Sequence, residues 1–398
     1  MSSTPQATRY GYITPEGIEQ FKRRMNKVTP LEEPFVRFVN TDSIQHAARA
    51  IGDSNPMWID REHGRASRYG RNIAPPALLY GVTWGSWDMR RGEGLPGVHG
   101  LHAHDRWIYY RPMLDGDEIH ATKEWTGLDE RTGKYAGRSL MQRREFKYYN
   151  QHDELIAKCL MASVRAERHE GKEKGKYSTV ERARYTDDDI RRIDEEIASE
   201  EVRGSAPRYW EDVSVGDAMK PIVRGPLTVG DMIAWMMGVG SPHVRSGQYW
   251  LAYRKRHPKI AIKDPVTGVP QPIERVHWDE FMASEIGMPA PYDYGSQRGA
   301  WATHAVTNWA GDDGWVAEVF AQFRGMNFLG DTMWIGGEVA KKWKGAKTGI
   351  GYVELTLKGI TQRGDNIMPG TAIVALPFKN APLPAFPIDH EADKPAEG

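Results

Sequence analysis

The pattern of apolar and polar positions divides the chain into two halves of similar design. In each half short amphipathic segments precede an apolar run with helical spacing, at 77–87 and at 296–310, and alternating positions after each run predict several β-strands. A charged segment at 165–207 separates the halves, and its part 186–201 has the pattern of an exposed helix. The repeated order predicts an α+β protein in which each half lays one long helix across a curved antiparallel sheet.

The halves also match each other position by position. Moving segment 58–76 by 219 positions (277 − 58) places it on 277–295 without a gap, and an aromatic–Arg pair shortly before Gly-Asp recurs in both halves. Such self-similarity predicts one domain type built twice. The predicted division is 1–164 for the first domain, 165–207 for a charged linker, 208–377 for the second domain with an insertion at 243–276, and 378–398 for a tail.

Composition and charge argue against nucleic acid and anionic membranes as binding partners. The 398 residues include 53 basic and 53 acidic side chains, so the chain as a whole has no charge that would attract nucleic acid or an anionic membrane. No apolar run reaches the length of a membrane span, and the first residues lack a secretory core, so we expect a cytoplasmic protein. The single cysteine, Cys159, excludes an intramolecular disulfide and lies in an apolar run typical of a core.

Two motifs carry a resemblance to a known family. "GDSNPMWID" at 52–60, followed by "IAPP" at 73–76, resembles the loop of the MaoC-like acyl dehydratases and (R)-specific enoyl-CoA hydratases. That loop reads roughly Gly-Asp-x-Asn-Pro-x-His-x-Asp and is followed by an Ile-Ala-His-Gly type turn. "RYWEDVSVGD" at 208–217 resembles the opening of a second such domain. The resemblance covers most of 10–164 and 208–377 and is closest to the two-domain acyl dehydratases of bacterial fatty-acid and steroid side-chain catabolism.

The resemblance implies a double hot-dog fold and a hydro-lyase that adds water to a 2-enoyl-CoA thioester or eliminates it. This chemistry needs a base for the water proton, an acid at the α-carbon and donors for the thioester oxygen. It implies no metal and no redox cofactor, because CoA is part of the substrate, and it favours a bulky or ring-bearing acyl group. Rival interpretations are a hot-dog thioesterase and a non-catalytic acyl-CoA-binding partner of another hot-dog subunit. A homo-oligomer or a hetero-oligomer is expected.

The family's catalytic motif is divided between the halves. The first half keeps Asp53 and Asn55 but has Trp58 where the family has histidine. The second half keeps His277 but has Val239 where the family has aspartate. We favour the second half, with His277 as general acid/base, because imidazole chemistry near neutral pH is hard to replace.

Further residues complete this hypothesis. Backbone N–H groups of Tyr294 and Gly295, at the start of the long helix, would hold the thioester oxygen, and Asp293 is predicted to belong to the same thioester-binding group. The carboxylate that pairs with His277 stays open among four residues, which are Asp279, Asp293, Asp264 and Glu274.

An alternative pairs Asp53 and Asn55 with a histidine from His99, His102 or His104, or from a partner chain. Without the resemblance Asp53 and Asn55 would be interpreted as turn and helix-cap residues, and Asp279 as a first-turn carboxylate. If 99–104 is a strand, His102 and His104 face one side of it, and His99 faces the other unless a bulge intervenes at Gly100.

The insertion at 243–276 is rich in basic and aromatic residues. A basic loop in an otherwise neutral chain is able to bind the nucleotide end of CoA, and a solvated surface loop is an equally good interpretation. The predicted CoA-binding residues are Arg254, Lys255 and Arg256 of the insertion, together with Arg298.

Overall fold

The computed structural model describes residues 11–84, 95, 97–133, 137–167, 177 and 180–394. The first half contains short helices followed by four long strands. Its helices are α1 (Pro15–Lys22), α2 (Thr41–Ile51), α3 (Pro56–Ile59), α4 (Arg61–Ala66) and α5 (Leu78–Trp84). Its strands are β1 (Thr29–Pro30), β2 (His99–Tyr109), β3 (His120–Gly133), β4 (Gly137–Tyr149) and β5 (Leu155–Ala166).

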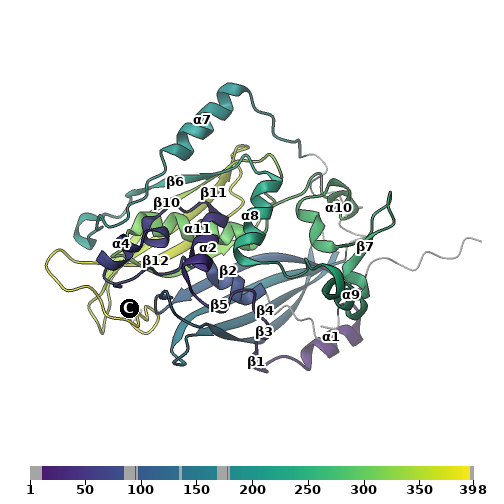
Figure 1. Ribbon diagram of the computed structural model, residues 1–398, viewed down its shortest axis with the longest axis horizontal. Helices are drawn as coiled ribbons and strands as arrows, with labels where there is room; N and C mark the ends of the chain where they lie inside the picture. Colours follow the sequence, from purple (N-terminus) through teal and green to yellow (C-terminus); the bar gives the residue numbers. More distant parts are fainter. Residues whose placement is uncertain are drawn as a thin grey trace, which may run out of the picture.

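The second half repeats this order after helix α7 (Asp187–Ala198), which projects from the rest of the molecule in Figure 1. The helices of the second half are α8 (Val229–Val239), α9 (Gly247–Arg256), α10 (Glu280–Glu285) and α11 (Gly295–Ala310), with the 3-10 turn η3 (Ile273–His277) before α10. The strands are β6 (Ala218–Arg224), β7 (Ala261–Lys263), β8 (Pro270–Pro272), β9 (Trp315–Gln322), β10 (Met333–Lys344), β11 (Gly351–Thr361) and β12 (Gly370–Leu376).

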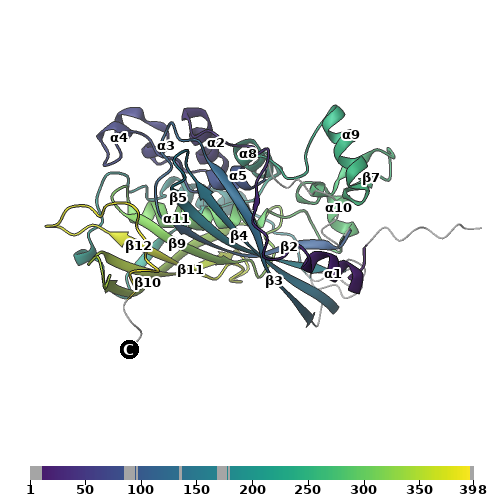
Figure 2. The same ribbon diagram turned by 90° about the horizontal axis from the view of Figure 1, so that it is seen from below.

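A single antiparallel sheet runs through both halves. In the described part of the chain its ten strands have the order β1-β3-β4-β5-β2-β9-β12-β11-β10-β6. Strands β2 and β9 join the halves at the centre, where Trp107 pairs with Val319. Figure 2 shows α2, α5 and α8 gathered on one side of this sheet, with α9 and β7 of the insertion at one end of the molecule. The fold is the predicted double hot-dog of α+β class.

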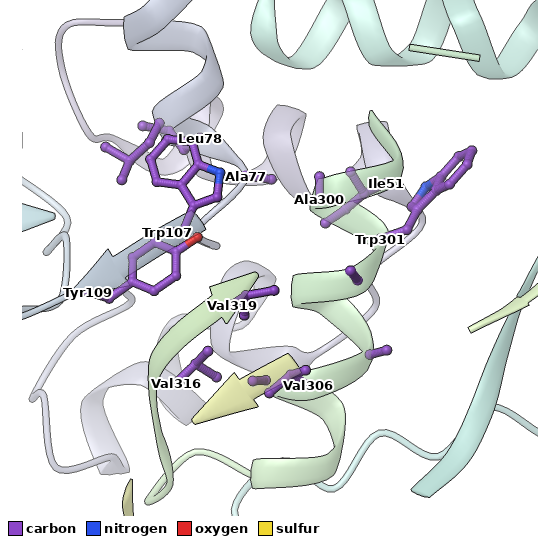
Figure 3. Packing of buried hydrophobic residues seen from close by; sticks show 14 of the residues in the cluster. Ile51, Ala77, Leu78, Trp107, Tyr109, Ala300, Trp301, Val306, Val316 and Val319 are labelled. Atoms are coloured by element: carbon purple, nitrogen blue, oxygen red, sulfur yellow. The ribbon is translucent and has the colours of Figure 1, made fainter. Parts of the chain in front are cut away.

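The main core lies between the sheet and helix α11. Figure 3 shows Trp107 of β2, Val316 and Val319 of β9, and Ala300 and Val306 of α11 around one apolar interior. Burying this surface is the main stabilising term. Cys159 is fully buried in the same core, as its apolar neighbours predicted.

Helix boundaries decide where the polar loops lie. Helix α2 begins at an Asn40–Ser43 capping box and ends at Gly52, whose φ of 69° lies in the left-handed region that glycine adopts at low cost. Asp53 therefore leaves the helix at a sharp turn. In α8 the capping box is formed by Thr228 and Asp231.

The helical runs expected from the pattern are present where the chain is described. The run at 296–310 forms α11, and the run at 77–87 begins α5, while 85–87 lie outside the described residues. The exposed helix expected within 186–201 is α7, of which only Ile193 is buried. No helix in the described part of the chain has both the length and the apolar character needed to cross a membrane.

Candidate active site

The start of helix α11 lies at the centre of the candidate site. Tyr294 is the N-cap residue of this 16-residue helix, and no side chain among the described residues caps its first turn. The first amide N–H groups, including that of Gly295, thus lack the side-chain oxygen that usually satisfies them. They lie at the positive end of the helix dipole, where an anionic oxygen is stabilised.

His277 lies directly over this helix start. Its ring stacks on the ring of Tyr294 with centroids 3.8 Å apart, and its Nδ1 donates to the backbone oxygen of Tyr292 at 2.8 Å. Because a carbonyl only accepts, Nδ1 carries the hydrogen and Nε2 keeps its lone pair. Burial lowers the pKa of His277 to about 4, although backbone hydrogen bonds act the other way. The imidazole is therefore neutral at pH 7 and able to accept a proton at Nε2.

Glu274 is the carboxylate that reaches this site. It is 3% exposed and accepts hydrogen bonds from the Tyr294 hydroxyl (2.8 Å), Ser241 Oγ (2.5 Å) and the backbone N–H of His243 (3.0 Å). Burial raises the pKa of Glu274, and these hydrogen bonds partly oppose the increase. Of the four carboxylates considered for His277, Glu274 is the one that accepts a hydrogen bond from the Tyr294 hydroxyl, so it holds the ring on which the imidazole stacks.

Two of the other carboxylates have structural partners. Asp279 caps α10 by accepting from the Met282 N–H at 2.9 Å, and it pairs with Arg275 at 2.8 Å. Asp264 closes a turn through Thr267 and pairs with the same Arg275. The first-turn interpretation of Asp279 is therefore the one that the contacts support.

Asp293 and Arg298 form a buried pair. The guanidinium binds both carboxylate oxygens, at 2.9 and 2.5 Å, and Arg298 is only 2% exposed. Arg298 also donates to the backbone oxygen of Gly325. Because its donors are used inside the protein, this arginine has no exposed face for a CoA phosphate, and the pair instead anchors the start of α11.

A second histidine approaches α11 from the first half of the chain. His102 of β2 lies so close to Gly295 that a Cβ added to this glycine would be 2.9 Å from the His102 Cβ and 3.0 Å from its Nδ1. On its other side His102 Nε2 lies 2.5 Å from Asp105 Oδ1. The expectation that His102 and His104 share a face of the strand is wrong, because the register shifts between them and Ala103 is an extra residue.

The first-half loop is organised around turns and caps. Asp53 Oδ1 accepts from the Asn55 N–H at 3.0 Å, and Asn55 Oδ1 caps α3 by accepting from Met57 N at 2.9 Å. The Asn55 amide also donates to Asp312 at 3.2 Å. The sequence alternative that brought His99, His102 or His104 to Asp53 is not what the structure contains.

The histidine beside Asp53 is His304 of α11, at 3.4 Å. Arg224 lies 2.6 Å from His304 Nδ1, and Glu200 lies 3.0 Å from Nε2. The four side chains are at most 11% exposed. Since both ring nitrogens of His304 have partners inside this cluster, the cluster holds the halves together and leaves no free nitrogen for substrate.

Sequence reasoning missed this cluster for identifiable reasons. Glu200 belongs to the charged segment that we interpreted as a solvated linker, and Arg224 ends a strand. A usable signal was the pair His304 and Asn308, four positions apart in helix α11, which places both on one face. The bonded partners of a buried polar pair cannot be inferred from that spacing alone.

An apolar cavity lies beside the first-half loop. It is partly open to solvent, and its lining includes Trp58, Pro76, Tyr109, Trp315 and Val316. Trp58, which stands where the family has histidine, is 5% exposed. The polar groups Asn55, Arg111 and Asp312 lie at its wall.

The cavity and the α11 start occupy equivalent places in the two halves. The offset of 219 pairs Pro76 with Gly295. The two aromatic–Arg pairs give an offset of 213 (324 − 111), which pairs His102 with Trp315. The site at the α11 start thus has Gly295 and His102 where the pseudo-symmetric cavity has Pro76 and Trp315, and proline has no N–H to donate.

The insertion places part of its basic surface in solvent. Lys255 and Arg256, in the last turn of α9, are exposed, whereas Arg254 is partly buried. Binding of CoA by these three residues stays a prediction.

A group with the composition of a metal site lies elsewhere. Glu318, His390 and Glu391 have ligand atoms within 4.8 Å of one another. The Arg106 guanidinium, however, already binds Glu318 and Glu391, at 2.7 and 2.8 Å. The positively charged guanidinium of Arg106 thus occupies the position that a metal ion would take. The cluster instead holds the C-terminal segment against strand β9.

Comparisons with known proteins agree with the fold. Residues 30–159 match the family model of the FAS1-like, dehydratase domain region. A UPF0336 protein of Streptomyces griseus is 29% identical over 107 residues, which are 26% of this chain and 68% of that protein. A UPF0336 protein of Parafrankia sp. is 26% identical over 130 residues, 31% of this chain and 83% of that protein.

Solved structures extend the likeness to most of the chain. A MaoC-like dehydratase has a TM-score of 0.64 at 16% identity and covers 90% of this chain and 100% of its own. A putative MaoC domain dehydratase from Chloroflexus aurantiacus has a TM-score of 0.56 at 13% identity, with 90% and 96% covered. A Mycobacterium tuberculosis protein described as a double hot-dog has a TM-score of 0.52 at 12% identity, with 89% and 97% covered. The resemblance stated from the motifs is confirmed.

Proposed function

We propose, from a double hot-dog chain whose residues 30–159 are of dehydratase type, that this protein hydrates a 2-enoyl-CoA thioester or dehydrates the corresponding hydroxyacyl-CoA. The observation that carries the proposal is the stacking of His277 on Tyr294 at the uncapped start of α11. A neutral imidazole and free backbone N–H groups meet there. The equivalent place in the first half has Pro75 and Pro76, which donate nothing.

In the hydration direction His277 Nε2 takes a proton from water while the water oxygen bonds to the β-carbon. The electron pair of the C=C bond moves toward the thioester oxygen, which the N–H groups of Tyr294 and Gly295 stabilise. Protonation of the α-carbon completes the addition. Dehydration is the same path reversed.

The cavity supports the bulky-acyl part of the proposal. Its lining residue Thr307 lies 12 positions after Gly295 (307 − 295), about 18 Å along the helix at 1.5 Å per residue. This separation matches the length of a long acyl chain, while residues 296–306 between the two points are buried in the core. Lys255 and Arg256 would then serve the phosphates of CoA.

Replacing His277 by Ala tests the assignment. We expect kcat for hydration of enoyl-CoA substrates to fall about 10²–10⁴-fold, because the water proton loses its acceptor. Loss of the conjugated enoyl thioester absorbance measures the rate. His152→Ala, at an exposed turn, is the matched control and is expected to keep the wild-type rate.

Two results would contradict the proposal and favour one of the alternative functions. Release of free CoA without hydroxyacyl-CoA would favour the thioesterase alternative. Activity that appears only after a second hot-dog subunit is added would favour a non-catalytic binding partner.

A further inference from the structure

We propose that His102 and Asp105, supplied by the first half of the chain, form a second acid/base pair of the α11 site and deliver the proton to the α-carbon. This inference rests on the proposed function. It differs from the family pattern described above, in which aspartate and histidine come from one loop of one domain, and it accounts for the missing carboxylate at Val239.

The first step is that the pair approaches the first turns of α11 from strand β2, whereas His277 stacks on Tyr294 from its own loop. His102 packs on Gly295, and Asp105 Oδ2 lies 3.7 Å from the position of a Cβ on Gly299, one turn further along α11. Glycine at 295 lets strand β2 approach the helix, because a side chain there would collide with the His102 ring, whereas at Gly299 the nearest atom is the Tyr80 hydroxyl, 2.8 Å from an added Cβ. The imidazole therefore lies next to the N–H groups that would hold the thioester oxygen.

The second step is the bulge in β2. Positions three apart on a regular strand face opposite sides of the sheet, so His102 and Asp105 would not meet. The extra residue Ala103 changes this, since His102 pairs with Ser163 and His104 with the adjacent Ala162. The bulge turns His102 to the face of Asp105, and bulges of this kind are common beside active sites.

The third step is that the pair is held in one orientation. Trp107 Nε1 donates to the Tyr80 hydroxyl at 3.0 Å, and that hydroxyl donates to Asp105 Oδ2 at 2.6 Å. The other carboxylate oxygen, Oδ1, lies 2.5 Å from His102 Nε2, which therefore carries hydrogen. Among the described residues Nδ1 of His102 has no hydrogen-bond partner, so this nitrogen is the one that can exchange a proton with a ligand.

The fourth step is the proton balance. In hydration His277 gains the proton that water loses, and the α-carbon needs one proton to become tetrahedral. His102 gives that proton from Nδ1 and becomes neutral, and Asp105 is the counter-ion of the imidazolium before the transfer. Solvent then returns both histidines to their starting states, so the net reaction is the addition of one water molecule.

The equivalent place in the first half supports this assignment. Trp315 stands where the second-half site has His102, and it lines the apolar cavity. The first-half place therefore lacks both features of the α11 site: prolines replace the N–H donors, and Trp315 replaces the imidazole of His102.

The test compares His102→Ala, His102→Asn and Asp105→Asn in the full-length protein, with a panel of enoyl-CoA substrates of different chain length. We expect kcat to fall about 10²–10⁴-fold for both His102 variants. Binding of a saturated acyl-CoA and the melting temperature should stay close to those of the wild type. His104→Ala is the matched control, because its ring lies against Phe320 on the other face, and it should keep the wild-type rate.

Two outcomes would overturn the inference while leaving the proposed function intact. One is a His102→Asn rate within threefold of the wild type when His277→Ala is impaired. The other is a loss of rate accompanied by an equal loss of acyl-CoA binding and of melting temperature, which would make the pair structural. A wild-type protein that converts no member of the panel would instead overturn the proposed function, and this inference with it.

Discussion

At the residue scale the divided motif has a physical explanation. Trp58 does not replace the chemistry of a histidine; it fills the wall of an apolar cavity beside two prolines that cannot donate a hydrogen bond. His277 keeps a lone pair at Nε2 over an uncapped helix start. On the proposed function, the first half supplies an apolar binding space and the second half supplies the reacting centre.

The buried cluster of Glu200 leads to a prediction on stability. Burial alone would raise the pKa of Glu200, but hydrogen bonds and charges from His304 and Arg224 outweigh it and hold the pKa at about 2. Because this value is below the ordinary value of 4.5, the stabilisation is present above pH 4.5 and is lost as the pH falls toward 2. Glu200→Gln should lower the free energy of unfolding by roughly 3 kcal/mol at pH 7.

Urea unfolding of both proteins between pH 7 and pH 3 measures this effect. The difference between wild type and variant should shrink as the pH falls. Glu201→Gln, at the exposed neighbouring position, is the control and should change little. A difference that stays constant with pH would show that Glu200 acts only through packing.

Residue roles were predictable from the sequence where an internal repeat supplied the alignment. The offset of 219 brought His277, Tyr294 and Gly295 into one hypothesis, and the structure places the three side by side. Their catalytic roles stay predictions. The contact between His304 and Glu200 could not be predicted from the sequence. It joins segments about a hundred residues apart, and no spacing rule relates the two positions.

At the element scale the instructive error concerns strand β2. Alternation predicts which residues share a face only while the register is regular. One extra residue, Ala103, reverses the result for His102, and an alanine among histidines has no signal that announces a bulge. The long helix α11 was easier, since its apolar pattern persists over four turns and its end at Gly311 is marked by a residue suited to φ = 73°.

Deleting Ala103 tests the importance of the bulge. The deletion should restore a regular register and turn His102 away from Asp105, so we expect kcat to fall at least as far as in His102→Ala. Stability should fall by about 1–3 kcal/mol. Ala103→Gly keeps the residue count and should cost under about 1 kcal/mol with activity retained. Full activity after the deletion, measured with the same enoyl-CoA assay, would contradict the role of the bulge.

At the scale of the whole molecule the two halves share one structure. The same sheet continues across the β2–β9 junction, and one apolar cluster includes residues from Val36 to Ile388. Neither half is able to unfold without exposing the inner surface of the other.

We therefore expect a single cooperative unfolding transition in calorimetry, with equal calorimetric and van't Hoff enthalpies. A substitution in the second half that destabilises the protein should lower the melting temperature of the whole chain. Two separate transitions, one of them insensitive to that substitution, would show that the halves fold independently.

The covalent union of the halves through adjacent central strands has an evolutionary corollary. In a dimer of identical subunits, each mutation changes both copies of a pocket. A mutation that replaces a catalytic side chain by an apolar one in the first copy therefore removes the same catalytic side chain from the second. Here a mutation enters once. A single gene can therefore specialise one pocket for binding the substrate and the other for the reaction. Neither specialisation depends on the concentration at which two chains associate.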